Sequence, residues 1–561
     1  MMRRLLRIFA SLAFAVAPIC AQSQSPPAHA AGSYSISGVV VSALTGQPLD
    51  RVVVTLQNAM GESLVGQTET GSDGRFIFEH LRAGKFALSA SRRGYIGMAY
   101  DEHEGYSTAI VTGEGLNTDR LTFRLRPRAV IRGFVSDDTG DPVQDARVSL
   151  YRIDMGSGLG NIVRAGNTTT DDTGAYEFPH LDAGNYYIAV TANPWYATRP
   201  QPRHDAEGNV LPDDQRSPLD VAYPTTFYAD VTDSDSATPI PVKAGDQVQV
   251  NLILHAVAAV HLSVQLGLPP GRGFVMPQLT QEIFGVSEPA QTGMAYNWGI
   301  REPQGNSGQS ESELGQTTVE LSGVAPGHYS VELHGGGDSN RSAVIEAASD
   351  THIDFSQAAG MADVSGKMVM DSGDKLPERL NISLRSSDGR FGGSDRVNDD
   401  GTFAIQGVPP GSYEIWVNAP DKSLAITHLT ASGAPADGNT VKIGTASVVL
   451  NAGLVQGSAT LTGFATRDGK PASGVMILLV PRNPAADREL FRRDQSDSDG
   501  SFQLNRVVPG QYTLVAIEDG WTLDWARPEV IAHYLPKGTK IIVPAQAKDY
   551  PVKDRIEVQA K

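Results

Sequence analysis

Flat aromatic side chains near predicted loops are the residues of this chain best suited to bind a ligand. Sugar recognition needs exposed rings that stack on pyranose faces, with acids or amides nearby to bind the hydroxyl groups. Trp521 and Trp525, beside Asp524, are the leading candidates, and Trp195 and Trp298 also lie in or next to predicted loops. In the alternative interpretation, these aromatic residues pack at junctions between modules, where a multidomain chain needs apolar contacts.

Acidic residues crowd before several glycines that are predicted to form turns. Asp497 and Asp499 precede Gly500 and are weak candidates for calcium ligands. However, the position that holds the bidentate glutamate in an EF-hand loop is occupied by Arg506. We favour a structural turn, in which the aspartates cap the backbone and the glycine adopts a positive φ. We therefore predict no metal site and no cofactor.

The elements that position these residues follow from a repeat in the sequence. In four copies, a turn glycine lies ten positions before a second glycine, and a fifth copy around Gly327 keeps only the second half. The second glycine follows alanine or proline and is expected to supply another turn, in which it tolerates a positive φ. Between and after the glycines, apolar residues alternate with polar ones, which is typical of strands with one buried face. Trp416 follows Ile415, which we expect to be buried, so it is expected to face outward unless another module covers it. The paired glycines are Gly74 and Gly84, Gly174 and Gly184, Gly401 and Gly411, and Gly500 and Gly510.

Each copy also has an opening strand, and most have a closing strand, so that about seven short strands occur in roughly 95 residues. This spacing predicts an all-β fold, a tandem array of about five immunoglobulin- or prealbumin-like β-sandwich domains. One short helix is expected at residues 528–535, with Pro528 in its first turn. In two copies a Gly/Asp-x-Pro turn follows the opening strand, at Gln47-Pro48 and Asp141-Pro142.

The order of these features resembles the carboxypeptidase regulatory-like domain. The opening strand, the D-G-x-[FY]-x-[FIL] strand, the [AP]-G-x-[YF]-x-[LIV] strand and the closing strand all match in four copies. The resemblance implies a transthyretin- or prealbumin-like sandwich, export from the cell, and residence at the surface or in the periplasm. The expected domains are residues 32–127, 128–257 (with a loop insertion), 258–357 (degenerate), 358–452, and 453–561 with the C-terminal helix.

Metallocarboxypeptidase activity is an obvious hypothesis, because such domains accompany those enzymes. His204 and Glu207 have the His-x-x-Glu spacing of the zinc motif, but they lie in a proline-rich loop instead of a rigid scaffold. Ser372 and Lys375 match S-x-x-K, yet they fall in a predicted hairpin turn and not on a helix. A catalytic carboxylate pair stays open, since the chain has 63 acidic residues and the sequence fixes no distances. We predict that the protein is not an enzyme, with a secreted hydrolase as the third-ranked alternative.

The first 21 residues have the pattern of a signal peptide, a basic start followed by an apolar run, with cleavage as late as residue 30 as an alternative. A lipoprotein anchored through Cys20 is less favoured, because the large Ile19 precedes the cysteine. No later stretch has the apolar length of a transmembrane helix. We expect an exported protein that is periplasmic, on the cell surface or extracellular.

The formal net charge of −17 disfavours nucleic acid as a partner. The favoured function is a non-catalytic binding or scaffold protein of the bacterial cell envelope, with polysaccharide or cell-wall glycan as the expected ligand. The alternative is a structural spacer or protein–protein interaction module that contacts other envelope proteins. The N-terminal part of an outer-membrane transporter is rejected, because a barrel would need many more strands of about ten residues.

Overall fold

The computed structural model describes residues 32–59, 63–198, 217–266, 277–290, 292–297, 318–333, 341–355, 359–386, 391–420, 422–545 and 547–561. Five separate hydrophobic cores follow one another along these residues. Each of the first four lies between two sheets, whereas the strands around the last are joined into one nine-stranded sheet. We call the five units modules 1 to 5. The prediction of an all-β tandem array of sandwich domains is confirmed.

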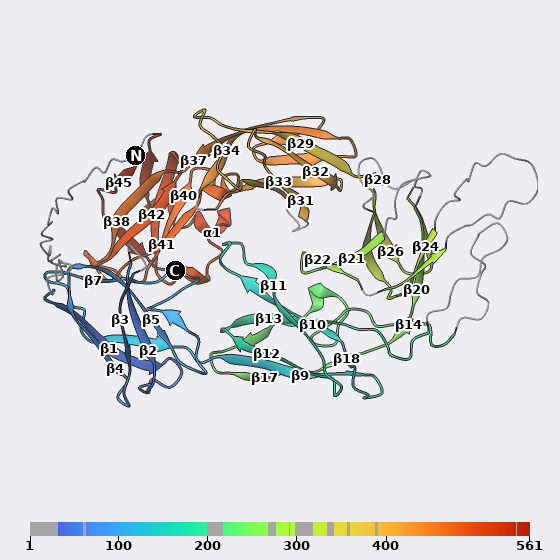
Figure 1. Cartoon of the computed structure of the whole chain (residues 1–561), viewed down its shortest axis with the longest axis horizontal. Coiled ribbons are helices and arrows are strands. Elements are labelled where there is room, and N and C mark those ends of the chain that lie inside the picture. Colours follow the sequence, from blue (N-terminus) through green and yellow to red (C-terminus); the bar gives the residue numbers. More distant parts are fainter. Residues whose placement is uncertain are drawn as a thin grey trace, which may run out of the picture.

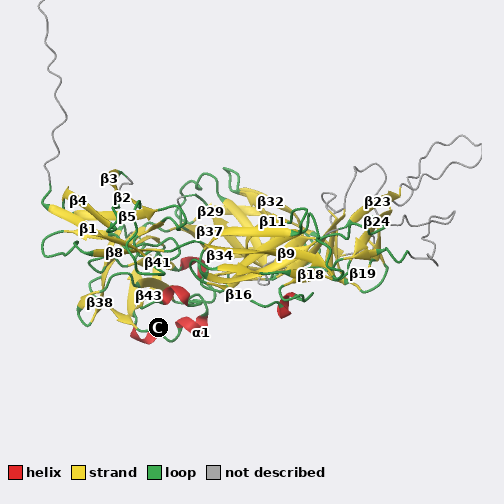
Figure 2. Ribbon diagram, turned by 90° about the horizontal axis from the view of Figure 1, so that it is seen from below, coloured by secondary structure: helices red, strands yellow, loops and turns green. Residues whose placement is uncertain are grey.

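The modules are arranged as a closed loop. Figure 1 shows them in chain order around a central opening, with the last module lying against the first two, and Figure 2 shows the same assembly from below. Module 1 consists of β1 (Tyr34–Ser42), β2 (Val53–Asn58), β3 (Leu64–Glu69), β4 (Arg75–Leu81), β5 (Gly84–Ser91), β6 (Met98–Ala99), β7 (Ile110–Thr112) and β8 (Leu121–Leu125). Module 2 consists of β9 (Ala129–Asp137), β10 (Arg147–Asp154), β11 (Asn161–Thr169), β12 (Ala175–Leu181), β13 (Gly184–Thr191), β14 (Val221–Ala222), β15 (Thr226–Phe227), the 3₁₀ turn η1 (Ser234–Ser236), β16 (Ile240–Val242), β17 (Gln247–Gln249) and β18 (Leu252–Leu254).

The remaining modules repeat this plan. Module 3 and its leading strand consist of β19 (Val257–Ala258), β20 (Val260–Gln265), β21 (Pro277–Ile283), β22 (Val286–Pro289), β23 (Gly293–Asn297), β24 (Thr318–Val324), β25 (Gly327–Leu333), β26 (Arg341–Ala347) and β27 (Thr351–Asp354). Module 4 and its leading strand consist of β28 (Ala359–Gly360), β29 (Ala362–Met370), β30 (Asn381–Ser386), β31 (Phe391–Arg396), β32 (Thr402–Val408), β33 (Gly411–Asn418), β34 (Leu424–Ser432), β35 (Ala436–Asp437), β36 (Thr440–Ile443) and β37 (Val448–Gln456). Module 5 consists of β38 (Ala459–Arg467), β39 (Lys470–Pro471), β40 (Met476–Pro481), η3 (Arg488–Leu490), β41 (Arg492–Gln495), β42 (Ser501–Val507), β43 (Gly510–Ile517), η4 (Gly520–Thr522), α1 (Pro528–Ile531), η5 (Leu535–Lys537), β44 (Thr539–Val543), β45 (Asp549–Pro551) and β46 (Ile556–Gln559).

The same pairing builds one sheet in every module. The opening strand pairs antiparallel with the strand that follows the turn glycine, as β1 does with β4, and parallel with the closing strand, as β1 does with β8. The equivalent pairs in the other modules are β9 with β12 and β17, β20 with β24 and β27, β29 with β32 and β37, and β38 with β42 and β45.

The turn glycines have a positive φ, as the sequence predicts. Gly74 has φ +71°, and a Cβ atom there would lie 2.6 Å from the carbonyl oxygen of Val40 in the opening strand. Gly500 has φ +79°, and its Cβ would lie 2.6 Å from the carbonyl oxygen of Ala465. Glycine is therefore required twice over, by the backbone conformation and by the close approach of the opening strand.

The second glycine of each repeat has a different role from the expected one. We expected it to take a positive φ, but the left-handed residue lies four positions earlier, for example His180 before Gly184 and Arg506 before Gly510. In modules 2 to 5 a tyrosine two residues after the glycine instead closes the turn, as in module 5, where the hydroxyl of Tyr512 donates to the carbonyl of Val508 at 2.7 Å; module 1 has Phe86 at this position. The small glycine leaves room for the tyrosine ring, which lies 3.3 Å from the position of a Cβ at Gly510.

The predicted helix is shorter than expected. α1 spans four residues, begins with Pro528 at its first position, and is followed by the 3₁₀ turn η5. The segments α1 and η4 pack on one face of the sheet that contains β40 and β43. Ile531 of α1 is fully buried there. Module 5 thus has a second hydrophobic cluster outside its sandwich core.

Candidate functional site: the junctions between modules

Trp521 and Trp525 lie in the second hydrophobic cluster of module 5, where modules 1 and 2 meet it. Only 5% of Trp521 and 6% of Trp525 is exposed. The cluster also contains Tyr106 from module 1 and Leu159 from module 2. His103 of module 1 stacks on Trp521 with a centroid distance of 5.5 Å and an interplanar angle of 6°. The two rings are therefore covered by other modules and do not face solvent.

Arg493 is the cation at the centre of this cluster. Its guanidinium lies 4.5 Å from the ring centre of Trp525, 5.1 Å from that of Tyr106 and 5.8 Å from that of Trp521. It also forms an ion pair with Glu104 of module 1 at 2.7 Å and donates to the carbonyl of Gly156 in module 2 at 3.0 Å. One side chain of module 5 thus binds to both other modules, and only 9% of it is exposed.

The acidic turn before Gly500 contacts the edge of module 1. Asp497 accepts a hydrogen bond from the backbone N–H of Ala109 at 3.0 Å and pairs with Lys85 at 2.5 Å. The backbone N–H of Ser498 donates to the carbonyl of Ala109 at 3.0 Å. Burial raises the pKa of Asp497, while its hydrogen bond and charge interaction with Lys85 lower it. The turn therefore extends the edge strand β7 with backbone and side-chain hydrogen bonds.

Gln495 adds a buried polar contact next to this turn. Its side chain is 1% exposed and donates to the backbone carbonyl of Asp101 at 2.6 Å and to the hydroxyl of Thr108 at 2.8 Å. Its Oε1 atom lies 3.1 Å from Nδ1 of His103. Both ends of the amide thus have partners in module 1, so the junction fixes the orientation of the two modules.

Module 2 meets module 5 through a loop of glycines. A Cβ atom at Gly158, which has φ +71°, would lie 2.5 Å from the Trp525 ring. The backbone N–H of Ala526 donates to the carbonyl of Gly158 at 2.9 Å, and Arg527 donates to the carbonyl of Leu159 at 2.8 Å. We call the combined junction of module 5 with modules 1 and 2 the clasp.

The burial of Trp521 and Trp525 in the clasp bears on their predicted role in sugar binding. A ring that stacks on a sugar must be open to solvent, whereas Trp521 and Trp525 are enclosed by protein groups. Asp524 pairs with Arg527 at 3.0 Å on the rim of the clasp. A role of Trp521, Trp525 and Asp524 in ligand binding stays a prediction, and it requires module 5 to separate from modules 1 and 2. Asp499 caps its own turn by accepting from the N–H of Ser501 at 2.9 Å.

Trp195 lies outside the clasp. Trp195 is 84% exposed and contacts Tyr196 edge-on, with ring centres 5.7 Å apart. Trp298, His204 and Glu207 lie outside the described residues. Ser372 is in the turn predicted for it, where its hydroxyl donates to Asp374. In the described residues no group of three or more histidine, cysteine or acidic side chains could hold a metal ion.

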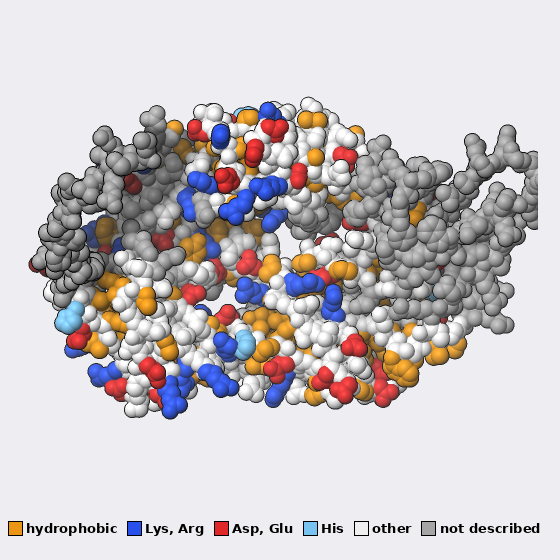
Figure 3. All heavy atoms as spheres, in the orientation of Figure 1, with side chains coloured by type: hydrophobic (Ala, Val, Ile, Leu, Met, Phe, Trp, Pro, Cys, Tyr) orange, Lys and Arg blue, Asp and Glu red, His pale blue; other side chains and the backbone are white. Residues whose placement is uncertain are grey.

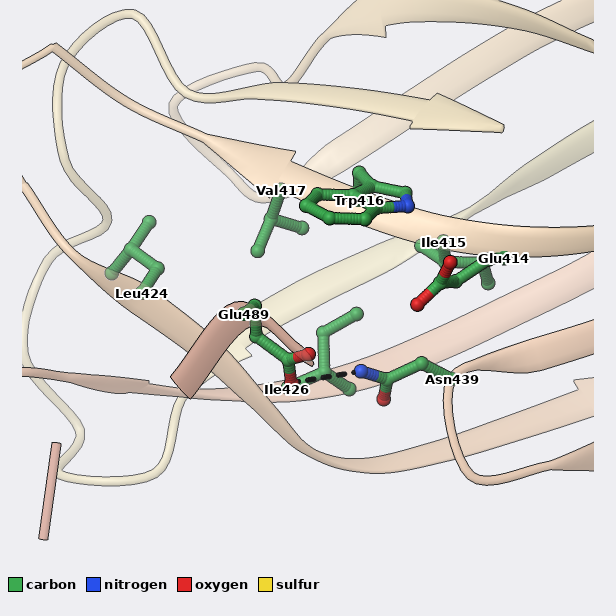
Figure 4. Close-up of a pocket in the computed structure, with 8 residues that line it drawn as sticks. All are labelled: Glu414, Ile415, Trp416, Val417, Leu424, Ile426, Asn439 and Glu489. Carbon is green, nitrogen blue, oxygen red and sulfur yellow. Dashed lines mark hydrogen bonds between the residues drawn. The ribbon is translucent and has the colours of Figure 1, made fainter. Parts of the chain in front are cut away.

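A small pocket lies where module 4 meets module 5. Figure 4 shows one face of the Trp416 ring turned toward Glu489 of module 5 and Asn439 of module 4, with Glu414 to one side. The Asn439 amide donates to Oε1 of Glu489 at 3.0 Å. Aliphatic side chains, including Val417 and Ile426, form the rest of the wall. The space inside is about 10 Å³, which is the room needed by one water molecule.

Two carboxylates and no basic side chain line the pocket, and the buried guanidinium of Arg492 interacts with the charge of Glu489. Burial raises the pKa of Glu489, and the nearby charges of Asp487 and Glu414 raise it further, while the hydrogen bond from Asn439 lowers it. Arg385 of β30 lies over the Trp416 ring, 5.6 Å from its centre, so this indole already holds one cation. Figure 3 shows both basic and acidic side chains on the face that it draws, with several basic ones beside the central opening.

Several residues that build these junctions were not predicted from the sequence, among them His103, Tyr106, Lys85 and Arg493. A usable signal exists in one place: residues 94–106 form an insertion rich in aromatic residues and glycine between β5 and β7, which is longer than a hairpin needs. Such an insertion favours a contact outside its own module.

Comparison with known proteins identifies part of the chain. The model of the carboxypeptidase regulatory-like domain matches residues 35–125 and 130–255. Modules 1 and 2 are thus similar to carboxypeptidase regulatory-like domains. Residues 455–534 match a different model, described as the second beta sandwich domain of BOS complex subunit NOMO1-like proteins. The resemblance stated for modules 1 and 2 is thus confirmed, and none of these descriptions names a catalytic domain.

Three individual proteins illustrate the similarity to parts of the chain. Serine-aspartate repeat-containing protein F of Staphylococcus epidermidis is 29% identical over 150 residues, which is 24% of this chain and 9% of that protein. The TIE protein of Bacillus anthracis aligns over 77% of this chain and 76% of its own, with 10% identity and a TM-score of 0.17. GBS52, the minor pilin of Streptococcus agalactiae, aligns over 40% of this chain and 97% of its own, with 14% identity and a TM-score of 0.20. Among the described residues, no helix is both long and apolar enough to cross a bilayer.

Proposed function

We propose that the protein is a non-catalytic scaffold of the cell envelope that holds its five modules in one closed arrangement and presents their outer faces to other envelope proteins. The observation that carries this proposal is the clasp. Arg493 is enclosed by three aromatic rings and also binds Glu104 and the carbonyl of Gly156. A flexible spacer would have no use for such a junction between its first two modules and its last one.

The other junctions support a fixed shape. Modules 2 and 3 share a hydrophobic cluster that contains Tyr151 and Phe227 from module 2 and Ile283 from module 3. Short strands also pair at two module boundaries, β14 with β19 and β26 with β28. Backbone pairing and shared apolar contacts restrict the angles between neighbouring modules. A scaffold with fixed angles can hold several partners at set distances.

Small-angle X-ray scattering of the exported chain tests the closed arrangement. A domain of about 100 residues has a diameter of about 34 Å, so five in line would span about 170 Å, while five in a ring would span about 90 Å. A maximum dimension near the smaller value supports the proposal. A value near the larger one would rule out a closed scaffold. Cross-linking to proteins of the envelope fraction then tests the partner class.

Carbohydrate binding is a second candidate, supported by Trp195. Its indole is 84% exposed, and an exposed flat ring is the feature that stacks on a pyranose face. Binding to insoluble polysaccharide and peptidoglycan should be lost in Trp195→Ala and kept in Ile253→Ala, which removes another exposed apolar side chain of module 2. Equal binding by both variants and the wild type would remove Trp195 from consideration.

A further inference from the structure

We propose that the pocket between modules 4 and 5 binds a primary ammonium group, namely the side chain of a lysine on a partner protein. The pocket is lined by the Trp416 ring, the carboxylates of Glu414 and Glu489, and the amide of Asn439. It lies apart from the clasp, so this inference goes beyond the scaffold role and does not depend on closure.

Size selects the group that enters. The enclosed space of about 10 Å³ accommodates one water-sized group, and an ammonium group has about that size. A pyranose ring is far larger than this space. The pocket therefore takes the tip of a ligand, and the body of that ligand remains outside.

Charge and ring geometry select a cation. An ammonium group between the Trp416 face and the Glu489 carboxylate would gain a cation–π contact on one side and a charge-assisted hydrogen bond on the other. Arg385 already uses the ring in this way.

The walls select the chain that carries the cation. Val417, Leu424 and Ile426 are aliphatic and line the same pocket. The methylene group next to the ammonium can lie against these walls, since lysine packs its stem along apolar surface while its charge reaches a polar partner. The hydroxyl groups that flank the amine of an amino sugar would lie against these aliphatic side chains. The walls therefore favour a protein lysine over an amino sugar.

Fluorine NMR of the full chain labelled with 5-fluorotryptophan tests this site. Trp416→Phe assigns the resonance of Trp416 among those of the five tryptophans. The probe is Nα-acetyl-lysine methylamide, and the matched probe is Nα-acetyl-norleucine methylamide, which has a similar stem but no charge. We expect the lysine probe to shift the Trp416 resonance with a Kd on the order of 1 mM.

The variants separate the site from the fold. Glu489→Gln keeps the acceptor for Asn439 but removes the charge, and should weaken binding about tenfold. Glu414→Gln serves as a second test if the first variant disturbs the junction, and Glu177→Gln, an exposed residue of module 2, should have no effect. No shift with the lysine probe, an equal shift with norleucine, or a shift with glucosamine alone would overturn the proposal. A scattering result that shows an open array would leave this site unaffected.

Discussion

Replacing Arg493 with methionine is expected to loosen the clasp while leaving the modules folded. Methionine keeps most of the volume and the apolar stem, so the cavity left behind is small. The variant loses the cation over three aromatic rings, a contact worth about 2 kcal/mol when desolvated. It also loses hydrogen bonds to Glu104 and to the carbonyl of Gly156, and a hydrogen bond to a charged group contributes about 1.5–3 kcal/mol.

The two losses are not additive, because Glu104 can turn to solvent once its partner is gone. We take about 3 kcal/mol as the net loss, which multiplies the open population about 150-fold. Native-state hydrogen exchange measures this directly, since the amides of Ala109 and Ser498 are bonded across the junction. Their exchange should accelerate about 150-fold in the variant, while core amides of β42 should keep their rates.

Arg467→Met is the matched control. Arg467 pairs with Glu518 in the same module, and the two side chains are 51% and 41% exposed. An exposed pair of this kind contributes less than about 1 kcal/mol. If Arg493→Met changed the exchange of Ala109 and Ser498 by no more than this control does, Arg493 would not be what holds modules 1 and 2 to module 5.

Two further predictions concern the clasp and module 5. Gly158→Ala should separate module 2 from Trp525, because the new Cβ would lie 2.5 Å from that ring, and tryptophan emission should shift to the red. Gly140 also has a positive φ, +88°, but nothing lies within 4 Å of its Cβ position, so Gly140→Ala should leave the emission unchanged. Burial raises the pKa of Asp494 to about 6, so the folded state favours the protonated form. Its contribution to stability is present below about pH 4 and is lost as the pH rises through 6. Asp494→Asn should therefore stabilise module 5 by up to about 3 kcal/mol at pH 7, and less at pH 4, which hydrogen exchange of β42 measures; Asp554→Asn, at an exposed aspartate, is the control variant. Equal effects at both pH values would contradict this reasoning.

The fold was predictable because its causes are local. The alternation that buries Phe502 and Leu504 and the turn at Gly500 lie within a few residues of each other, and the same pattern recurs in each module. The second glycine was misread for a related reason: the sequence marks the turn but not which residue turns left-handed, and His180 takes that position although it has a side chain.

The junctions could not be predicted in the same way. Trp521 is covered by His103 and Tyr106, which lie about four hundred positions earlier in the chain and in another module. Nothing in the spacing of either segment refers to the other. Only the insertion between β5 and β7 hints that module 1 makes a contact beyond its own core.

The prediction of a ligand site at Trp521 and Trp525 and the observed clasp rest on the same chemistry. Aromatic faces, a nearby acid and an arginine occur in ligand-binding sites, and the same side chains also form contacts between modules of one chain. Here the occupant of the aromatic cluster is Arg493, a residue of the same chain. Trp416 differs because its pocket retains a water-sized space beside two carboxylates. A search for binding sites in such chains should therefore ask which aromatic faces remain unoccupied after the modules have packed.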